Sequence, residues 1–134
     1  MVRLEIAALY VGINLLILLF LAGIVISNRW KHKIVLGDGD NAAMRRAVRA
    51  HANAAEYMPG ALVGLVLLAL LEPAAPNWLL HTGGIFLTVG RIFHGVGLNL
   101  GARNIGRMMG TILTLASYLI IGGGLIYAAL AAQL

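Results

Sequence analysis

Four long apolar segments nearly fill this chain, and they restrict it to a membrane fold. The segments cover about residues 4–27, 43–71, 77–98 and 106–132. A helix crosses a bilayer core of roughly 30 Å with about 20 apolar residues, so each segment is long enough to span. Composition agrees, because 60% of the 134 residues are hydrophobic and only 11% are charged. We therefore expect a single all-α domain over residues 1–134, a bundle of four transmembrane helices.

The first segment, Leu4 to Ser27, is interpreted as a spanning helix. A secretory signal is the alternative, but its apolar core has roughly 7 to 15 residues and is followed by a small-residue cleavage site. The segment here is longer, only Arg3 precedes it as a basic residue, and no such cleavage site stands before the polar loop.

Basic residues predict the orientation of the chain. Six of the ten lie between Asn28 and Arg49, and two more lie in the third connection at Arg103 and Arg107. The second connection has no lysine or arginine. By the positive-inside rule, the first and third connections are cytoplasmic and both termini are on the non-cytoplasmic side of the inner (plasma) membrane. The net charge of +5 then reflects topology and attraction to anionic membrane lipid, and we expect no nucleic acid partner.

Polar residues recur on one face of each of the last three predicted helices. At about 100° per residue, each stripe fits within an arc of roughly 60° to 80°. The stripes consist of Arg45, Arg49, Asn53 and Glu56 in the second helix, Arg91, His94 and Leu98 in the third, and Arg107, Thr111, Thr114 and Tyr118 in the fourth. All three stripes begin on the predicted cytoplasmic side.

Charged groups in a spanning helix are costly, so they face a partner or a wet cavity. One interpretation pairs Glu56 with Arg49 or Arg91, while Arg45, Arg46 and Arg103 reach lipid phosphates. Glu56 cannot balance all of these arginines, so the excess of positive charge favours a bound anion. A metal site is not expected, because the chain has no cysteine and its four histidines are scattered.

Two runs carry a family resemblance. They read R-A-H-A-N-A-A-E-Y-M-P from Arg49 to Pro59 and R-I-F-H-G-V-G from Arg91 to Gly97, and Arg103 and Arg107 follow. This combination resembles the MAPEG family, the membrane-associated proteins in eicosanoid and glutathione metabolism. The similarity covers essentially the whole chain, and the LGDGDN loop resembles that of bacterial members.

The resemblance implies a homotrimer of four-helix bundles that binds glutathione between subunits, in the cytoplasmic half of the membrane. Matched by position, the glutathione contacts are Arg49, Asn53, Glu56 and Tyr57 in the second helix, Arg91 and His94 in the third, and Arg29 and Arg103 in the first and third connections. Arg107 of a neighbouring subunit would lie beside the thiol and stabilise the thiolate. The implied activity is a glutathione transferase or peroxidase acting on a lipophilic small-molecule electrophile.

Departures from the family pattern leave two alternatives open. Leu98 stands where several catalytic members have a cofactor-binding tyrosine, which favours a generic bacterial-type transferase over specialised eicosanoid synthesis. One branch of the family binds lipid without catalysis, and this is the first alternative. The second is a small four-helix multidrug exporter, but such transporters place a carboxylate deep in the first helix, whereas here Glu5 is near its outer end.

Overall fold

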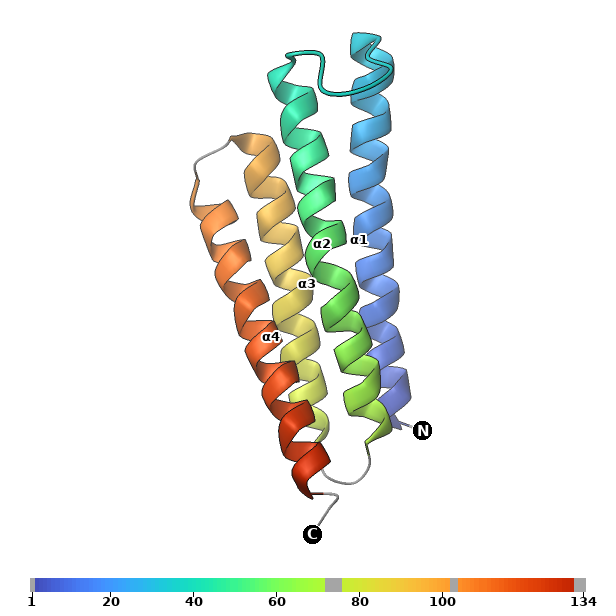
Figure 1. The fold of residues 1–134 in the computed structure, drawn as a ribbon, viewed down its shortest axis with the longest axis vertical. Helices are drawn as coiled ribbons and strands as arrows, with labels where there is room; N and C mark the ends of the chain where they lie inside the picture. The colour runs from blue at the N-terminus through green and yellow to red at the C-terminus, as the bar shows by residue number, and fades with distance from the viewer. Residues whose placement is uncertain (1, 72–75, 102–103, 132–134) are drawn as a thin grey trace.

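The protein is a bundle of four antiparallel helices (Figure 1). The structure is a computed structural model that describes residues 2–71, 76–101 and 104–131. The helices are α1 (Val2–His32), α2 (Ala42–Leu70), α3 (Asn77–Leu100) and α4 (Ile105–Ala131). The predicted all-α four-helix fold is confirmed.

The first helix is longer than predicted. We expected it to end at Ser27, but α1 continues to His32 because none of the polar residues that follow breaks a helix. The chain leaves the helix at Lys33, where φ is 55°. Asn41 caps α2, since its side-chain oxygen accepts hydrogen bonds from the backbone N–H groups of Ala43 and Met44.

Three of the four helices are long and apolar enough to cross a membrane, judged over the described residues: α1, α2 and α4. Helix α3 was also predicted to span, but it is not among these three, because its sequence is less apolar. It carries Arg91 and His94, and both side chains are buried inside the bundle. Since α3 packs against all three other helices, its polar groups face protein.

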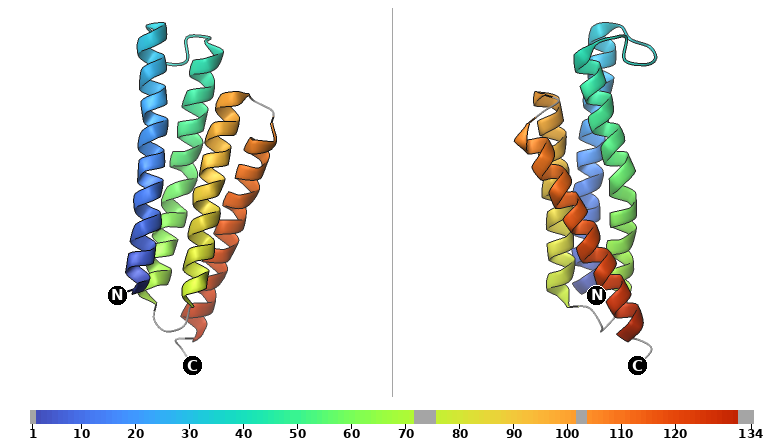
Figure 2. Two further views of the ribbon diagram at one scale, coloured as in Figure 1. Left: turned by 180° about the vertical axis from the view of Figure 1, so that it is seen from behind. Right: turned by 60° about the vertical axis from the view of Figure 1, so that its left-hand side comes forward.

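The helices form two offset pairs. The most extensive contact is between α3 and α4, followed by that between α1 and α2, whereas α1 and α4 do not touch within the described part of the chain. The α1–α2 pair extends beyond α3 and α4 at one end (Figures 1 and 2). This offset leaves the first turns of α2 standing past the end of α3.

Glycines allow α3 and α4 to approach closely. A Cβ atom on Gly90 would lie 2.8 Å from Thr114 Oγ1 and 3.0 Å from the carbonyl oxygen of Gly110. At the end of this contact, the Asn104 amide donates to the carbonyl oxygens of Gly97 and Gly101, and Asn104 Oδ1 accepts from the Arg107 N–H. These contacts fix where the first turn of α4 presents Arg107.

The bundle interior holds two apolar clusters and a layer of polar side chains. The larger cluster includes Leu65, Leu80 and Ile121, and the smaller one surrounds Leu21 and Met58. In the layer, Asn14 Nδ2 of α1 donates to Thr88 Oγ1 of α3 at 2.8 Å, and Arg91 of α3 bonds to α2 and α4. The layer thereby links all four helices at one level. Such interhelical bonds fix register where apolar burial provides little driving force.

Candidate functional site

A cationic cavity of about 270 Å³ opens at the end of the bundle where the helix pairs are offset. Its lining comes from α2, α3 and α4 and consists of Arg45, Arg46, Arg49, Asn53, His94, Leu98 and Arg107. The lining has four arginines and, among the residues that the structure describes, no carboxylate. Because like charges in a partly dry site repel, this arrangement favours an anionic ligand.

Arg91 lies beneath the cavity and is held by neutral partners. Its side chain is only 3% exposed, and its Nη1 donates to Asn53 Oδ1 at 2.9 Å. Its Nε donates to Thr114 Oγ1 at 3.0 Å, and Nη2 donates to the same hydroxyl oxygen. The Tyr57 ring lies 5.5 Å from the guanidinium carbon, within the range of a cation–π contact. Arg91 therefore orients Asn53, which lines the cavity, and adds buried positive charge behind it.

Two tyrosines stand beside this arginine. Tyr118 of α4 donates its hydroxyl to the Tyr57 carbonyl oxygen of α2 at 2.6 Å, and the two rings meet edge to face at 6.2 Å. Gly60 leaves room for the Tyr118 hydroxyl, since a Cβ there would lie 3.0 Å from its oxygen. The pair ties α4 to α2 one helical turn below Asn53.

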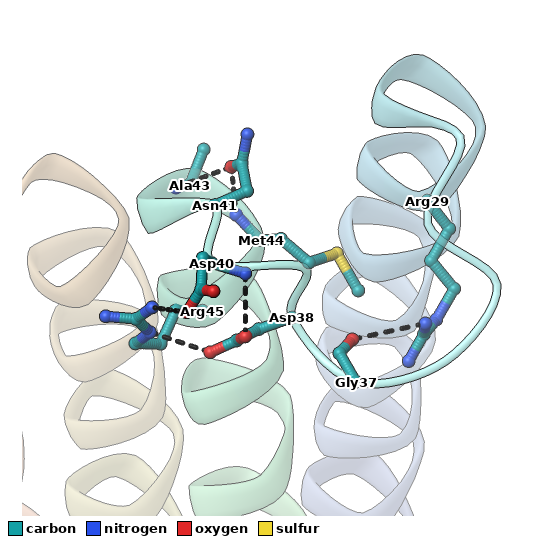
Figure 3. Close-up of polar contacts among 8 residues, drawn as sticks. All are labelled: Arg29, Gly37, Asp38, Asp40, Asn41, Ala43, Met44 and Arg45. Atoms are coloured by element: carbon teal, nitrogen blue, oxygen red, sulfur yellow. Dashed lines mark hydrogen bonds and ion pairs between the residues drawn. The ribbon is translucent and has the colours of Figure 1, made fainter.

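Arg45 lines the cavity but is bound to the α1–α2 loop (Figure 3). Its Nε donates to Asp38 Oδ2 at 2.7 Å, and its Nη2 lies 3.5 Å from Asp40 Oδ1. The hydrogen bond from Arg45, followed by that from the Asp40 N–H, holds the pKa of the Asp38 carboxyl below its usual value. In the structure the partners of Arg45 are therefore two loop carboxylates.

Most of the predicted site residues come together. Arg49, Asn53, His94 and Arg107 line the cavity, while Arg91 and Tyr57 lie directly beneath it. The resemblance implied that a neighbour's Arg107 completes the site, yet one protomer already brings its own Arg107 to the cavity. Arg103 lies outside the described residues.

Glu56 and Arg29 are exceptions. Glu56 is exposed, does not line the cavity and forms no ion pair within the described residues, so the pairings with Arg49 and Arg91 are wrong for the single chain. Arg29 lies at the end of α1 and donates to carbonyl oxygens of the α1–α2 loop, including that of Val35 at 3.2 Å. The single chain therefore does not bring Arg29 to the cavity.

The contacts of two residues, Arg46 and Thr114, were not predicted. Arg46 lines the cavity, although it lies about 100° around the helix from Arg45 and was assigned to lipid phosphates. Thr114 was placed on the polar face of α4, but its partner Arg91 is 23 positions away and periodicity gives no such pairing. Only the close approach of α3 and α4 brings these two side chains together.

These features define a multi-pass, all-α membrane protein with an arginine-rich cavity at one end of its bundle. A sequence model of the MAPEG family matches residues 7–127, and the chain belongs to this family. It is similar to the protein named "Inner membrane protein YecN" from two strains of Escherichia coli. In each case 33% of 95 aligned residues are identical, and the alignment covers 70% of both chains.

No solved structure gives a significant match to the chain. The spanning helices and the inner-membrane relative support a multi-pass location in the inner membrane.

Proposed function

We propose that this protein is a membrane-bound glutathione transferase or peroxidase that acts on lipophilic electrophiles. The observation that carries the proposal is the cationic cavity, whose lining combines four arginines with Asn53 and His94. The MAPEG family, to which the chain belongs, includes glutathione transferases and peroxidases.

The charges of glutathione fit this lining. The tripeptide has two carboxylates and one ammonium group, and arginine binds carboxylates in a bidentate geometry. Arg45 is paired with Asp38, and we assign two other arginines of the lining, Arg46 and Arg49, to the carboxylates. The Asn53 amide, oriented by Arg91, would hydrogen-bond the peptide backbone.

Arg107 would activate the thiol. A free thiol has a pKa near 8.5, and only the thiolate attacks, so a cation in a partly desolvated site raises the reactive fraction. In conjugation, the thiolate forms a C–S bond with an aromatic carbon and the halide leaves. In peroxide reduction, two glutathione molecules supply two electrons, so that a hydroperoxide becomes an alcohol and water while glutathione disulfide forms.

The cavity of one chain is small for the complete site. Its volume of about 270 Å³ lies below the range of roughly 300 to 1,000 Å³ typical of ligand pockets. Glu56, the residue expected to meet the glutathione ammonium, is exposed on α2 outside the lining. Both facts support a homotrimer in which a neighbouring protomer completes the site, as the family resemblance implies.

A second hollow could receive the lipophilic substrate. A groove of about 530 Å³ runs between α1 and α3, and most of its lining is aliphatic or aromatic, including Ile13, Phe20 and Val96. Arg91 belongs to its wall and also contacts Asn53 of the cationic cavity. A hydrophobic electrophile could therefore enter from the bilayer and reach the level of the thiolate.

The proposal is tested by glutathione conjugation of a generic aromatic halide in nanodiscs. We expect Arg107→Ala to lower kcat/KM by roughly 10²-fold, as loss of one preorganised charge-stabilising donor does in other enzymes. Arg45→Ala is the matched control, because Arg45 lines the same cavity but is bound to Asp38. Its rate should stay within a few-fold of wild type. Equal rates in wild type and Arg107→Ala, with both proteins folded, would remove Arg107 from the mechanism.

The non-catalytic lipid binder of the same family is the second candidate. It is favoured by Leu98, which lines the cavity without a hydroxyl for the cofactor. A protein of that kind would give no glutathione turnover in the same assay and no thiolate signal. Export is disfavoured, because α1 carries its acidic residue, Glu5, in the first turn.

A further inference from the structure

The α1–α2 connection presents apolar side chains beside basic ones. Trp30 is 83% exposed, Val35 94% and Leu36 88%, although all three are large hydrophobic residues. Lys31 and Lys33 are exposed next to them. We call these five residues the Trp30 surface. Tryptophan and lysine with aliphatic neighbours are the composition of a membrane–water interface.

The length of α1 brings this surface to the headgroup level. Its 31 residues correspond to roughly 46 Å at about 1.5 Å per residue, which exceeds a bilayer core of roughly 30 Å. The last turns of the helix therefore extend past the hydrocarbon, and Trp30 lies in them. An exposed tryptophan at such a level inserts its ring among lipid headgroups.

The loop that follows is held in a defined shape. Arg29 Nη1 donates to the carbonyl oxygens of Val35 at 3.2 Å and Gly37 at 3.4 Å, and Gly37 takes a φ of 69°. Figure 3 shows the loop turning back alongside α1, so that the Arg29 side chain reaches along the helix to meet it. The backbone of Val35 is thereby held beside the last turn of α1, next to Trp30.

A hollow beside this loop combines cations with apolar walls. Its volume is about 450 Å³, and it is lined by Arg29, Trp30, Lys33, Ile34 and Val35. The hydrogen bonds that Arg29 makes within the described residues all leave from Nη1 and go to carbonyl oxygens of the loop. The loop acids Asp38 and Asp40 are turned toward Arg45 on the opposite side (Figure 3).

We propose that the Trp30 surface and this hollow bind the phosphate group of an anionic phospholipid. Lys31 and Lys33 supply the charge complementarity, the Trp30 ring and the aliphatic side chains contact the glycerol and upper acyl region, and Arg29 holds the loop in place. This role takes Arg29 away from glutathione contact. It is independent of the glutathione chemistry, since none of these residues lines the cationic cavity.

The test uses the two tryptophans as reporters at opposite ends of the bundle. In a Trp78→Phe background, Trp30 fluorescence is measured in nanodiscs that contain the same fraction of brominated phosphatidylglycerol or brominated phosphatidylcholine. Lysines near an anionic surface each favour it by roughly fivefold, so we expect quenching by the anionic lipid to exceed that by the zwitterionic lipid by about twofold or more. Lys31→Gln with Lys33→Gln should remove the difference.

Trp78 provides the matched control in a Trp30→Phe background. It is 63% exposed in the first turn of α3, where no lysine or arginine neighbours it in sequence, so both brominated lipids should quench it equally. Equal quenching of Trp30 by the two lipids would overturn the proposal. So would a preference for the anionic lipid that persists after both lysines are replaced.

Discussion

Replacing Thr114 by valine removes the acceptor that Arg91 uses for two of its N–H groups. Thr114 is 1% exposed and Arg91 is 3% exposed, so water cannot replace the lost hydroxyl. Arg91 Nε donates to it at 3.0 Å, Nη2 also donates to it, and only the Asn53 contact remains as a side-chain partner. The variant therefore leaves a buried cation with two unsatisfied donors.

The expected loss of stability is set by comparing hydrogen-bond energies in soluble proteins with those in membranes. A hydrogen bond to a charged group contributes about 1.5 to 3 kcal/mol in soluble proteins. Interhelical bonds in membranes average about 0.6 kcal/mol, because the unfolded chain in lipid also finds partners. Since one hydroxyl serves two donors of a charged group, we expect Thr114→Val to lower the free energy of unfolding by about 2 kcal/mol.

The assay is reversible unfolding in mixed micelles with increasing dodecyl sulfate. Thr111→Val is the matched control, because Thr111 is exposed one turn earlier on α4 and bonds only to the Arg107 carbonyl of its own helix. This control should change stability by less than about 0.5 kcal/mol. Equal effects of the two variants would refute the reasoning that the Arg91 bonds hold α3 to α4.

Two further predictions concern packing and pH. Gly90→Ala should destabilise the fold by about 1 to 3 kcal/mol in the same assay, because the added Cβ would lie 3.0 Å from the Gly110 carbonyl oxygen. Gly122→Ala is the control and should be neutral, because a Cβ added there would have no neighbouring atom within 4 Å. Because the pKa of Asp38 is lowered, its carboxylate is ionised and bonded to Arg45 at any pH above the usual carboxyl pKa of about 3.9. The bond is lost as the pH falls through the lowered pKa. Hydrogen exchange of the loop, corrected for intrinsic rates, should therefore be constant from about pH 5 to 8 and rise below about pH 4. Asp38→Asn should abolish that dependence, and an unchanged profile in this variant would exclude the ion pair as its cause.

The fold was predictable because membrane helices follow simple patterns. Segment length and apolar composition predicted four helices. The end of the first helix was misplaced, since polar residues mark where the bilayer ends and do not stop a helix that continues into water. Periodicity also grouped Thr114 and Tyr118 in one polar stripe of α4, and both bond to other helices.

The partners of the charged side chains were not predictable in the same way. The sequence offered Glu56 as the nearby counter-charge for Arg49 and Arg91, but it is exposed, and Arg91 instead bonds to Asn53 and Thr114. These contacts depend on the relative rotation and offset of helices, which one sequence does not encode locally. The cavity likewise combines side chains of α2, α3 and α4, so it depends on how these helices are placed.

The most direct measurement of the central claim is the thiolate difference absorbance near 240 nm when glutathione is titrated into the protein in nanodiscs. If Arg107 lowers the pKa of the bound thiol, wild type should give a saturable signal at neutral pH, Arg45→Ala a similar signal, and Arg107→Ala a much weaker one. Absence of any signal in wild type, or an undiminished signal in Arg107→Ala, would contradict the assignment of this cavity to glutathione activation.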